Sequence, residues 1–390
     1  MRLTFHGGFG EKGRTSLAVA GGGVRLLLDA GIDTAATGPA RYPAITPAEL
    51  AGLDALLVTH AHEDHLAALG WCLANRFRGR ILMTPETLAE RESCLAAYAE
   101  PRHRAPAARA PVETFQAGET LAFGDLTVET GRSGHAVGGV WFRVRDVSGA
   151  SVLYCGDTVP RSPVLAMDPL PPSDVVLFDA SYGDDAVPAE RRAGDIRAHL
   201  AARPGPCLLP VPLLGRPVEL LRLLDPPIAI HRLLREPLRA QIADGAWLRE
   251  GAGADLAWRL DMAHDWSDGE PFPGLPLLVH DAMGLGGPSQ EAIPRAVAAG
   301  VPILFTGHLP TGSPGALALE RGRADWIRLP THPTWPDNLE TLDACGPAWA
   351  TGHSCPAPVM AALARQRPGV LRTVRVGETL DVAALVRVGA

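Results

Sequence analysis

Seven consecutive residues, 59–65, read Thr-His-Ala-His-Glu-Asp-His and bring three imidazoles and two carboxylates together. Neutral histidine is the commonest metal ligand in proteins, and carboxylate oxygens also bind Zn²⁺. The preceding residues 53–58 form a short, mainly apolar run that is typical of a buried strand. The pattern therefore predicts a metal site in the loop that follows this strand.

Further ligands are expected from distant parts of the chain, because one loop cannot complete two metal sites. Three candidates each follow a glycine directly, namely His135, Asp157 and His353. A small neighbour lets the backbone approach a crowded metal centre closely. We therefore group these three residues with the cluster at 60–65 as candidate ligands.

Short apolar runs separated by Gly, Asp and Pro fill the first half of the chain. They predict strands at residues 24–28, 55–58, 126–129, 140–144, 152–154 and 175–178. Helical patterns at 66–75 and 85–98 make the arrangement a layered α/β one. Several predicted strands end close to a residue that can do chemistry: Asp29, His60, Asp157 and Asp179.

The pattern changes after Gly183. It predicts helices at 186–202, 216–224 and 289–299 and strands at 207–212, 275–279 and 303–305. This alternation suggests a second, smaller α/β unit. From about residue 327 the strand ends again carry His and Asp, so the second unit reads as an insertion.

Composition limits the function classes. The 390 residues carry a formal net charge of −7, which argues against a protein that coats nucleic acid electrostatically. Lys12 is the only lysine, so nearly all positive charge is arginine. The six cysteines are scattered without a Cys-x-x-Cys pair, which favours a reducing, cytoplasmic location. We expect no signal peptide and no membrane span, because no sufficiently long apolar stretch is present.

The residues at 60–65, with the isolated His135, Asp157 and His353, resemble the metallo-β-lactamase fold. The resemblance implies that a pair of divalent ions is bound, with Zn²⁺ expected and Mn²⁺ as the alternative. It also implies a division of ligands: His60, His62 and His135 for one ion, Asp64, His65 and His353 for the other, and Asp157 as the bridge. Asp29 matches an early Asp of this family, which would orient a ligand.

Later segments extend the resemblance to the β-CASP nucleases, the branch that includes RNase J and the endonuclease subunit of the cleavage and polyadenylation machinery. These segments are 178–184 (Phe-Asp-Ala-Ser-Tyr-Gly-Asp), Gly215-Arg216, and glycine-rich turns at 281–289 and 306–315. The implied fold class is α/β, a metallo-β-lactamase αββα sandwich with an inserted β-CASP α/β cap domain. The implied domains are residues 1–183, 184–326 and 327–390.

Two positions depart from the usual pattern of this branch. Ala180 stands where Ser or Thr is usual. His332 lies between Thr331 and Pro333, whereas the branch usually has Ala on one side and Ala or Thr on the other. His332 is nevertheless the only His at the appropriate place for this motif.

The resemblance implies a mechanism. Two ions would share a water and lower its pKa, so that hydroxide forms near neutral pH. Asp64 would orient the hydroxide or take its proton, and His332, held by Asp179, would protonate the leaving 3′ oxygen. Phosphates of the substrate would be bound by a further set of residues: Arg216, Ser289, His308, Thr311 and Ser313. For Ser289 and Ser313, helix capping is an equally good reading.

The predicted function is therefore a metal-dependent nuclease that hydrolyses single-stranded nucleic acid. RNA is favoured over DNA because His353 stands where RNA enzymes of the branch tend to carry His and its eukaryotic DNA enzymes Val. The alternatives are a DNA exonuclease of the same branch, a non-catalytic β-CASP scaffold, and a small-molecule esterase or lactonase. The sequence leaves open internal versus terminal cutting, a homo-oligomer, and a partner in a processing complex.

Overall fold

The residues around the histidine cluster at 60–65 belong to a unit built on two β-sheets. The computed structural model describes residues 1–389, with side chains described through residue 386. It divides into two units. Unit 1 comprises Met1–Pro160, Met167–Ala186 and His332–Ala390, and unit 2 comprises Arg161–Ala166 and Val187–Thr331. The sequence predicts an insertion over residues 184–326, whereas the longer segment of unit 2 runs from Val187 to Thr331.

The first sheet of unit 1 has the strand order β21-β1-β3-β4-β5-β6-β7. Its strands are β1 (Arg2–Gly7), β3 (Ser16–Gly21), β4 (Val24–Leu28), β5 (Ala55–Leu57), β6 (Arg80–Met83), β7 (Glu113–Thr114) and β21 (Thr379–Asp381). Strands β4, β5, β6 and β7 pair in parallel. Parallel strands are usually covered on both faces, which explains why β5 reads as an unbroken apolar run and is wholly buried.

The second sheet of unit 1 has the order β19-β12-β11-β10-β9-β8. Its strands are β8 (Thr120–Phe123), β9 (Leu126–Arg132), β10 (Val140–Asp146), β11 (Ser151–Tyr154), β12 (Val175–Asp179) and β19 (Trp349–His353). Strands β11, β12 and β19 are parallel, with Asp179 in register with His353. Two short strands, β2 (Phe9–Gly10) and β20 (Cys355–Pro356), pair separately.

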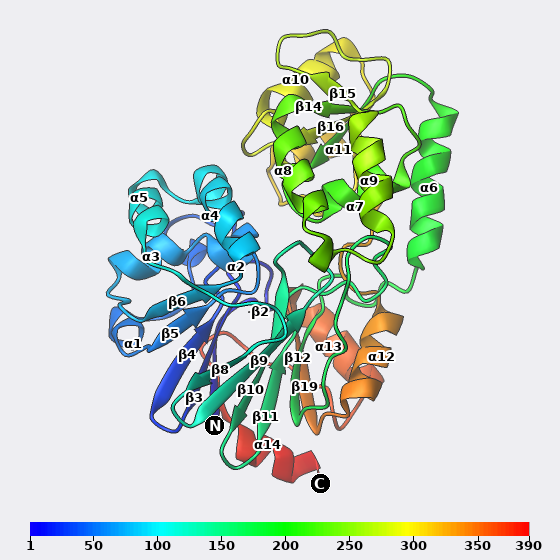
Figure 1. The fold of residues 1–390 in the computed structure, drawn as a ribbon. Coiled ribbons are helices and arrows are strands. Elements are labelled where there is room, and N and C mark those ends of the chain that lie inside the picture. The colour runs from blue at the N-terminus through cyan, green and yellow to red at the C-terminus, as the bar shows by residue number, and fades with distance from the viewer. Residues whose placement is uncertain (390) are drawn as a thin grey trace. The chain divides into compact units, whose positions relative to one another are not determined.

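Helices cover the outer faces of these two sheets (Figure 1). Beside the first sheet lie α1 (Pro47–Ala51), α2 (Glu63–Leu66), α3 (Leu69–Ala74), α4 (Pro85–Tyr98) and α5 (Pro101–Arg109). Beside the second lie α12 (Trp335–Cys345) and α13 (Ala357–Gln366). The remaining elements of unit 1 are η1 (Gly38–Arg41) and α14 (Val382–Gly389). The predicted αββα sandwich is thus confirmed.

Unit 2 contains a four-stranded parallel sheet of order β13-β16-β14-β15. These strands are β13 (Cys207–Val211), β14 (Ala229–His231), β15 (His264–Trp266) and β16 (Pro276–His280). The short pair β17 (Leu304–Phe305) and β18 (Asp325–Trp326) completes the strands. The helices are α6 (Ala189–Ala202), α7 (Arg216–Leu223), α8 (Arg232–Ala243), α9 (Ala252–Asp261), α10 (Ser289–Ala299), α11 (Pro314–Glu320) and the short η2 (Gly245–Trp247).

Most element predictions match the structure, and one difference concerns the site directly. The helix expected at 66–75 is two helices, α2 and α3, and α2 begins at Glu63 with His62 as its N-cap. The metal motif therefore occupies the start of a helix rather than a loop alone. Among residues 1–389, none of the helices combines the length and apolar character that crossing a bilayer requires.

A short segment before β12 belongs to unit 2, which the sequence did not indicate. Leu165 forms a β-bridge with Leu248, and Ala166 N donates to the carbonyl of Trp247 at 2.9 Å. The hydroxyl of Ser162 donates to the carboxyl group of Glu219 on α7. Glu219 is buried, and burial raises its pKa to about 7 despite the opposing effects of Ser162 and Arg249.

This buried acid predicts a pH-dependent stability of unit 2. The pKa of Glu219 rises from 4.5 to about 7 on folding. The folded state favours the protonated, neutral carboxyl group of Glu219. Its contribution to the free energy of unfolding is therefore fully present below pH 4.5 and is lost as the pH rises through about 7. The difference corresponds to on the order of 3 kcal/mol. We expect Glu219→Gln to remove this dependence, as measured by urea unfolding at pH 5 and pH 8.

The matched control is Glu190→Gln, which neutralises an exposed glutamate on α6 of the same unit. It should leave the pH dependence of unfolding as in the wild type. If Glu219→Gln lost stability between pH 5 and pH 8 to the same extent as the wild type, another group would be responsible.

Candidate metal centre

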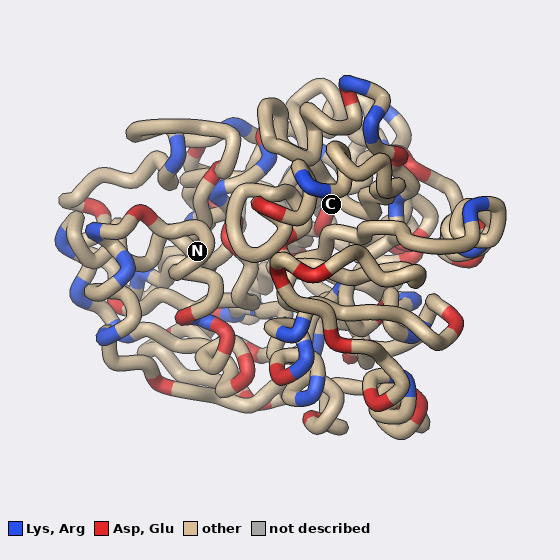
Figure 2. The backbone as a smooth tube through the Cα atoms, turned by 90° about the horizontal axis from the view of Figure 1, so that it is seen from above, with Lys and Arg blue, Asp and Glu red and all other residues tan. Residues whose placement is uncertain are grey.

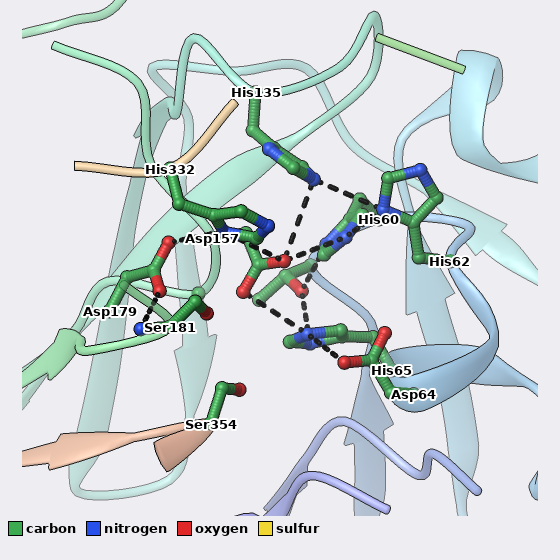
Figure 3. Close-up of polar contacts among 12 residues, drawn as sticks. His60, His62, Asp64, His65, His135, Asp157, Asp179, Ser181, His332 and Ser354 are labelled. Carbon is green, nitrogen blue, oxygen red and sulfur yellow. Dashed lines mark hydrogen bonds and ion pairs between the residues drawn. The ribbon is translucent and has the colours of Figure 1, made fainter. Parts of the chain in front are cut away.

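The polar residues that follow the strands meet at one edge of unit 1. Parallel strands present their carboxyl ends on the same side of a sheet. Asp29 and His60 follow β4 and β5 in the first sheet, and Asp157 and Asp179 lie at the ends of β11 and β12 in the second. His135 comes from the turn between β9 and β10. Figure 3 shows His60 and His135 pointing toward Asp157, with Asp179 on the other side of His332.

Four side chains form a compact group of ligand atoms: His60, His62, His135 and Asp157. His62 Nδ1 lies 3.0 Å from both His60 Nε2 and His135 Nε2. One carboxylate oxygen of Asp157, Oδ2, lies 3.7 Å from His60 Nε2 and 3.5 Å from His135 Nε2.

These separations fit a tetrahedral ion. Zn²⁺ binds His nitrogen and carboxylate oxygen at about 2.0–2.2 Å, so ligand atoms at the corners of a tetrahedron are about 3.3–3.6 Å apart. The separations in the structure, between 3.0 and 3.7 Å, bracket that value. His60, His135 and Asp157 are buried, whereas His62 is half-buried.

The second carboxylate oxygen of Asp157 faces another set of side chains. Its Oδ1 lies 3.3 Å from His65 Nε2, which in turn lies 3.7 Å from Asp64 Oδ2. Both Asp157 Oδ1 and His65 Nε2 are buried without a hydrogen-bond partner among the described residues. Such groups are costly unless something binds them. Asp157 therefore presents one oxygen to each of two candidate ion positions.

Asp29 fixes the orientation of this second set. The residue adopts a left-handed backbone conformation with φ of 62°, directly after β4. Its carboxylate accepts hydrogen bonds from Thr59 N at 2.7 Å and from the Thr59 hydroxyl at 2.8 Å. His65 Nδ1 lies 2.7 Å from the same group, so Nε2 is left to face Asp157. A carboxylate behind a ligating His in this way sets its tautomer and ring orientation.

Tyr154 is a member of this network that the sequence did not suggest. Its hydroxyl donates to Asp29 Oδ2 at 2.7 Å, from β11 of the other sheet. The one available signal was its position near Asp157, at the end of a predicted strand. The hydroxyl of a buried tyrosine usually forms a hydrogen bond, so some polar partner for Tyr154 is expected in general.

The electrostatics of the cluster favour metal-binding protonation states. Burial, followed by the neighbouring His65, holds the pKa of His60 well below its usual value. Burial and His135 do the same to the pKa of His62. Burial alone would raise the pKa of Asp157, but His65 and His332 hold it well below its usual range. Neutral imidazole and ionised carboxylate are the forms that bind metal.

His332 and Asp179 form a pair beside this centre. His332 Nδ1 lies 2.8 Å from Asp179 Oδ2 and 3.7 Å from Asp157 Oδ2. The carboxylate of Asp179 is held in turn by the backbone N–H groups of Thr158 and Ser181. Because Nδ1 is engaged, exchange of a proton with a substrate falls to Nε2 of His332.

His353 lies next to the second ligand set with both ring nitrogens already in contact with protein. Its Nε2 is 3.0 Å from the carbonyl oxygen of Gly156, and its Nδ1 is 3.0 Å from the Ser354 hydroxyl. The ring of His65 is 6.3 Å away, centre to centre. To bind an ion, His353 would have to exchange the contact with Gly156 for the metal, so its role as a ligand stays a prediction.

The five residues predicted to bind phosphate all belong to unit 2. The Ser289 hydroxyl donates to Asp281 at 2.9 Å, and the Ser313 hydroxyl caps α11 by accepting from Ala316 N at 3.2 Å. Both serines are buried. Ser313 is the N-cap of α11, whereas Ser289 is the first residue of α10 and is held by Asp281 without capping that helix. His308 and Thr311 are exposed, and Arg216 contacts the Thr331 hydroxyl at 3.4 Å.

Comparison with known proteins gives a family match over part of the chain. Residues 24–208 match the model of the beta-lactamase superfamily domain. Endoribonuclease YSH1 of Yarrowia lipolytica is 28% identical over 250 residues, which cover 59% of this chain and 30% of that protein. Cleavage and polyadenylation specificity factor subunit 3 of Dictyostelium discoideum is 26% identical over 247 residues, covering 58% and 32%.

Another relative is cleavage and polyadenylation specificity factor 73 of Drosophila melanogaster, 28% identical over 234 residues that cover 55% of this chain and 34% of that protein. The chain spans about a third of the length of these curated relatives. A crystal structure of a protein of unknown function from Enterococcus faecalis V583 matches with a TM-score of 0.62 and 13% identity. It covers 97% of this chain and 99% of its own, and this likeness concerns the fold alone.

The Asp29 network predicts the consequence of one substitution for metal affinity. We expect Asp29→Asn to lower Zn²⁺ affinity by about 10–100-fold, because the carboxylate that orients His65 is lost. Tyr154→Phe, which removes only one of the hydrogen bonds to Asp29, should have a smaller effect. Competition with a chromophoric chelator measures both, after circular dichroism has shown that the variants are folded. An unchanged affinity of a folded Asp29→Asn protein would contradict this role.

Proposed function

We propose that the chain, of which residues 24–208 match the beta-lactamase superfamily domain, is a metal-dependent nuclease of the β-CASP type that hydrolyses phosphodiester bonds of single-stranded RNA. The observation that carries the proposal is the carboxylate of Asp157, which offers one oxygen to His60 and His135 and the other to His65. Similarity to endoribonucleases and to polyadenylation factors supports RNA as the substrate.

The converging ligand atoms of His60, His62, His135 and Asp157 fit one divalent ion, and a second ion beside it is part of the proposal. His60, His62 and His135 would hold one ion, Asp64 and His65 the other, and Asp157 would bridge them, with His353 as a further ligand of the second ion. When bound, Zn²⁺ or Mn²⁺ at these positions supplies Lewis acidity, which makes water nucleophilic near neutral pH and offsets negative charge on a phosphate.

The chain itself supplies the proton chemistry. Asp64, whose carboxylate lies 3.7 Å from His65 Nε2, would orient the attacking water or take its proton. His332 would protonate the leaving oxygen through Nε2, with Asp179 keeping the imidazole oriented through Nδ1 at 2.8 Å. Burial lowers the pKa of His332, whereas Asp179 and Asp157 raise it, and the net direction is upward. A raised pKa keeps the acid protonated near neutral pH, as a general acid requires.

The complete set of candidate ligands argues against the scaffold alternative. A non-catalytic relative has no need of four ligand atoms converging on one point, whereas His60, His62, His135 and Asp157 converge here. The remaining alternatives, a DNA exonuclease and an esterase or lactonase, are separated by the choice of substrate. Assembly with a processing partner and a cytoplasmic location are further parts of the proposal.

The proposal predicts the effect of two substitutions on RNA cleavage. We expect Asp64→Ala and His332→Ala each to lower kcat by at least about 10²-fold, since each removes a group that positions water or transfers a proton. The assay uses zinc-loaded protein and labelled single-stranded RNA, with single-stranded DNA and a generic ester in parallel. Circular RNA and RNA with a 5′ phosphate or 5′ hydroxyl distinguish internal from terminal cutting.

The control for His332→Ala is His264→Ala, which removes an exposed imidazole of β15. It should cleave at the wild-type rate. Chelation should abolish cleavage and added Zn²⁺ should restore it, which separates this activity from a contaminating metal-independent ribonuclease. Wild-type rates in both Asp64→Ala and His332→Ala would show that the proposed site does not perform the reaction.

A further inference from the structure

His135 reaches the metal centre from a different part of the chain than its nearest fellow ligand. It lies in the loop between β9 and β10, whereas His62 belongs to the segment that follows β5. His135 Nε2 nevertheless lies 3.0 Å from His62 Nδ1, and both residues belong to the compact ligand group. The spacing of these two ligands therefore depends on what attaches the β9–β10 loop to the rest of unit 1.

Backbone hydrogen bonds attach the two ends of this loop. At its start, Val159 N donates to the carbonyl oxygen of Ser133 at 3.0 Å. Directly after it, Val140 N donates to the carbonyl oxygen of Thr59 at 3.0 Å. These bonds fix the base of the loop, and residues 134–139 lie between them.

Two threonine hydroxyls at the start of α4 hold the part of the loop that follows His135. Thr84 and Thr87 donate to the carbonyl oxygen of Gly138, at 2.9 and 3.1 Å respectively. Both threonines are fully buried, so water does not compete for these bonds. Gly138 has a φ of 85°, and a Cβ placed on it would lie 2.8 Å from Thr87 N. The loop backbone is therefore in direct contact with the first turn of α4.

Helix capping explains only one of the two hydroxyls. Thr84 is the N-cap of α4, and its oxygen accepts from Thr87 N at 3.2 Å, which is the usual role of an N-cap threonine. The hydroxyl of Thr87 has no part in this cap. Thr84 has one hydroxyl hydrogen, which can go to Gly138 or to Thr87 Oγ1 at 2.9 Å. Thr87 can donate to Gly138 in either case, so it is the constant donor.

The same helix supports the other ligand of the pair. His62 is the N-cap of α2, and α2 packs against α4. Helix α4 thus contacts the element that begins at His62 and, through Thr87, the loop that carries His135. A change at the first turn of α4 would move one ligand relative to the other.

We propose that Thr87, together with Thr84, positions His135 as a metal ligand by holding the carbonyl group of Gly138 against α4. Thr87 is a positioning residue, since it acts through His135 and is not a ligand itself. This inference rests on the metal centre of the proposed function and adds the residues that set the spacing of two of its ligands. Hydrogen-bonding groups behind metal ligands typically change metal affinity by about 10–100-fold.

The test removes the hydroxyl of Thr87 and keeps its shape. Thr87→Val retains the β-branched side chain and the backbone N–H that Thr84 accepts. We expect it to lower Zn²⁺ affinity about tenfold, as measured by competition with a fluorescent chelator. Thr87→Ser, which keeps the hydroxyl, should restore most of the affinity. Threonine, serine and valine are all neutral, so the acidic and basic positions along the backbone in Figure 2 are unchanged, and altered charge cannot cause the effect.

The matched control is Thr130→Val, which removes another buried threonine hydroxyl from unit 1. Thr130 donates to the carbonyl oxygen of Glu119 at 2.9 Å, and neither residue is a candidate ligand. We expect urea unfolding of the metal-free proteins to show a similar loss of stability in Thr130→Val and Thr87→Val. Only Thr87→Val should lose zinc affinity, because a purely structural role would affect the two variants alike.

A double-mutant cycle tests whether Thr87 acts through His135. In a His135→Ala background, measured with a weaker chelator, Thr87→Val should cause no further loss of zinc affinity, because the ligand that it positions is gone. Equal losses in the two backgrounds would show that Thr87 acts by another route and would overturn the inference. Wild-type affinity in a folded Thr87→Val protein would overturn it as well.

Failure of the proposed function would be recognised separately. A wild-type protein that binds zinc but does not cleave RNA would contradict the nuclease, while the affinities of the Thr87 variants would still decide this inference. A wild-type protein that binds no zinc would overturn both.

Discussion

The buried carboxylate of Asp29 is the constraint on which the metal centre depends. Its oxygens accept hydrogen bonds from Thr59 and Tyr154 and contact His65, so residues from both sheets meet at one group. An ionised group buried without such partners would be strongly unfavourable. The donors therefore cannot separate without a large cost, and this holds the two sheets together at the edge where the candidate ligands lie. The strained φ of Asp29 is compatible with this role, because strained residues persist only where their surroundings determine them.

Around this constraint the site divides into two chemically different sides. Neutral imidazoles with lowered pKa values, His60 and His62, lie on the side that suits an ion. His332, whose pKa is raised, lies on the side that suits proton donation. Asp157 faces both sides through the same oxygen, because Oδ2 lies 3.7 Å from His60 Nε2 and 3.7 Å from His332 Nδ1. Its other oxygen, Oδ1, faces His65. One carboxylate thus couples the place where water would be activated to the place where a leaving group would be protonated.

Much of this arrangement could be predicted from the sequence, for physical reasons that differ by element. Strand β5 and the last three residues of β4 are buried and therefore appear as apolar runs, and the polar residues after them mark the edge of the site. The pairing of Tyr154 with Asp29 could not be predicted, because it depends on how two sheets pack rather than on any local pattern. Ser289 and Ser313 show that a local pattern can also mislead. Both lie in glycine-rich turns that resemble phosphate-binding loops, but in the structure the hydroxyl of Ser289 donates to Asp281 and that of Ser313 accepts from Ala316 N. The contact of His353 with Gly156 likewise depends on the register of distant strands.

The segment Arg161–Ala166 has a consequence for dividing the protein into parts. The backbone passes between the two units at 160/161, 166/167, 186/187 and 331/332, so unit 2 is not one continuous stretch. A fragment cut at 187 and 331 would lack the Ser162 hydroxyl and would leave the carboxyl group of α7 buried without its donor. Residues 187–331 alone are therefore unsuited to being expressed or grafted as an independent domain. The separate segment Arg161–Ala166 contributes three buried side chains to unit 2, those of Ser162, Val164 and Leu165.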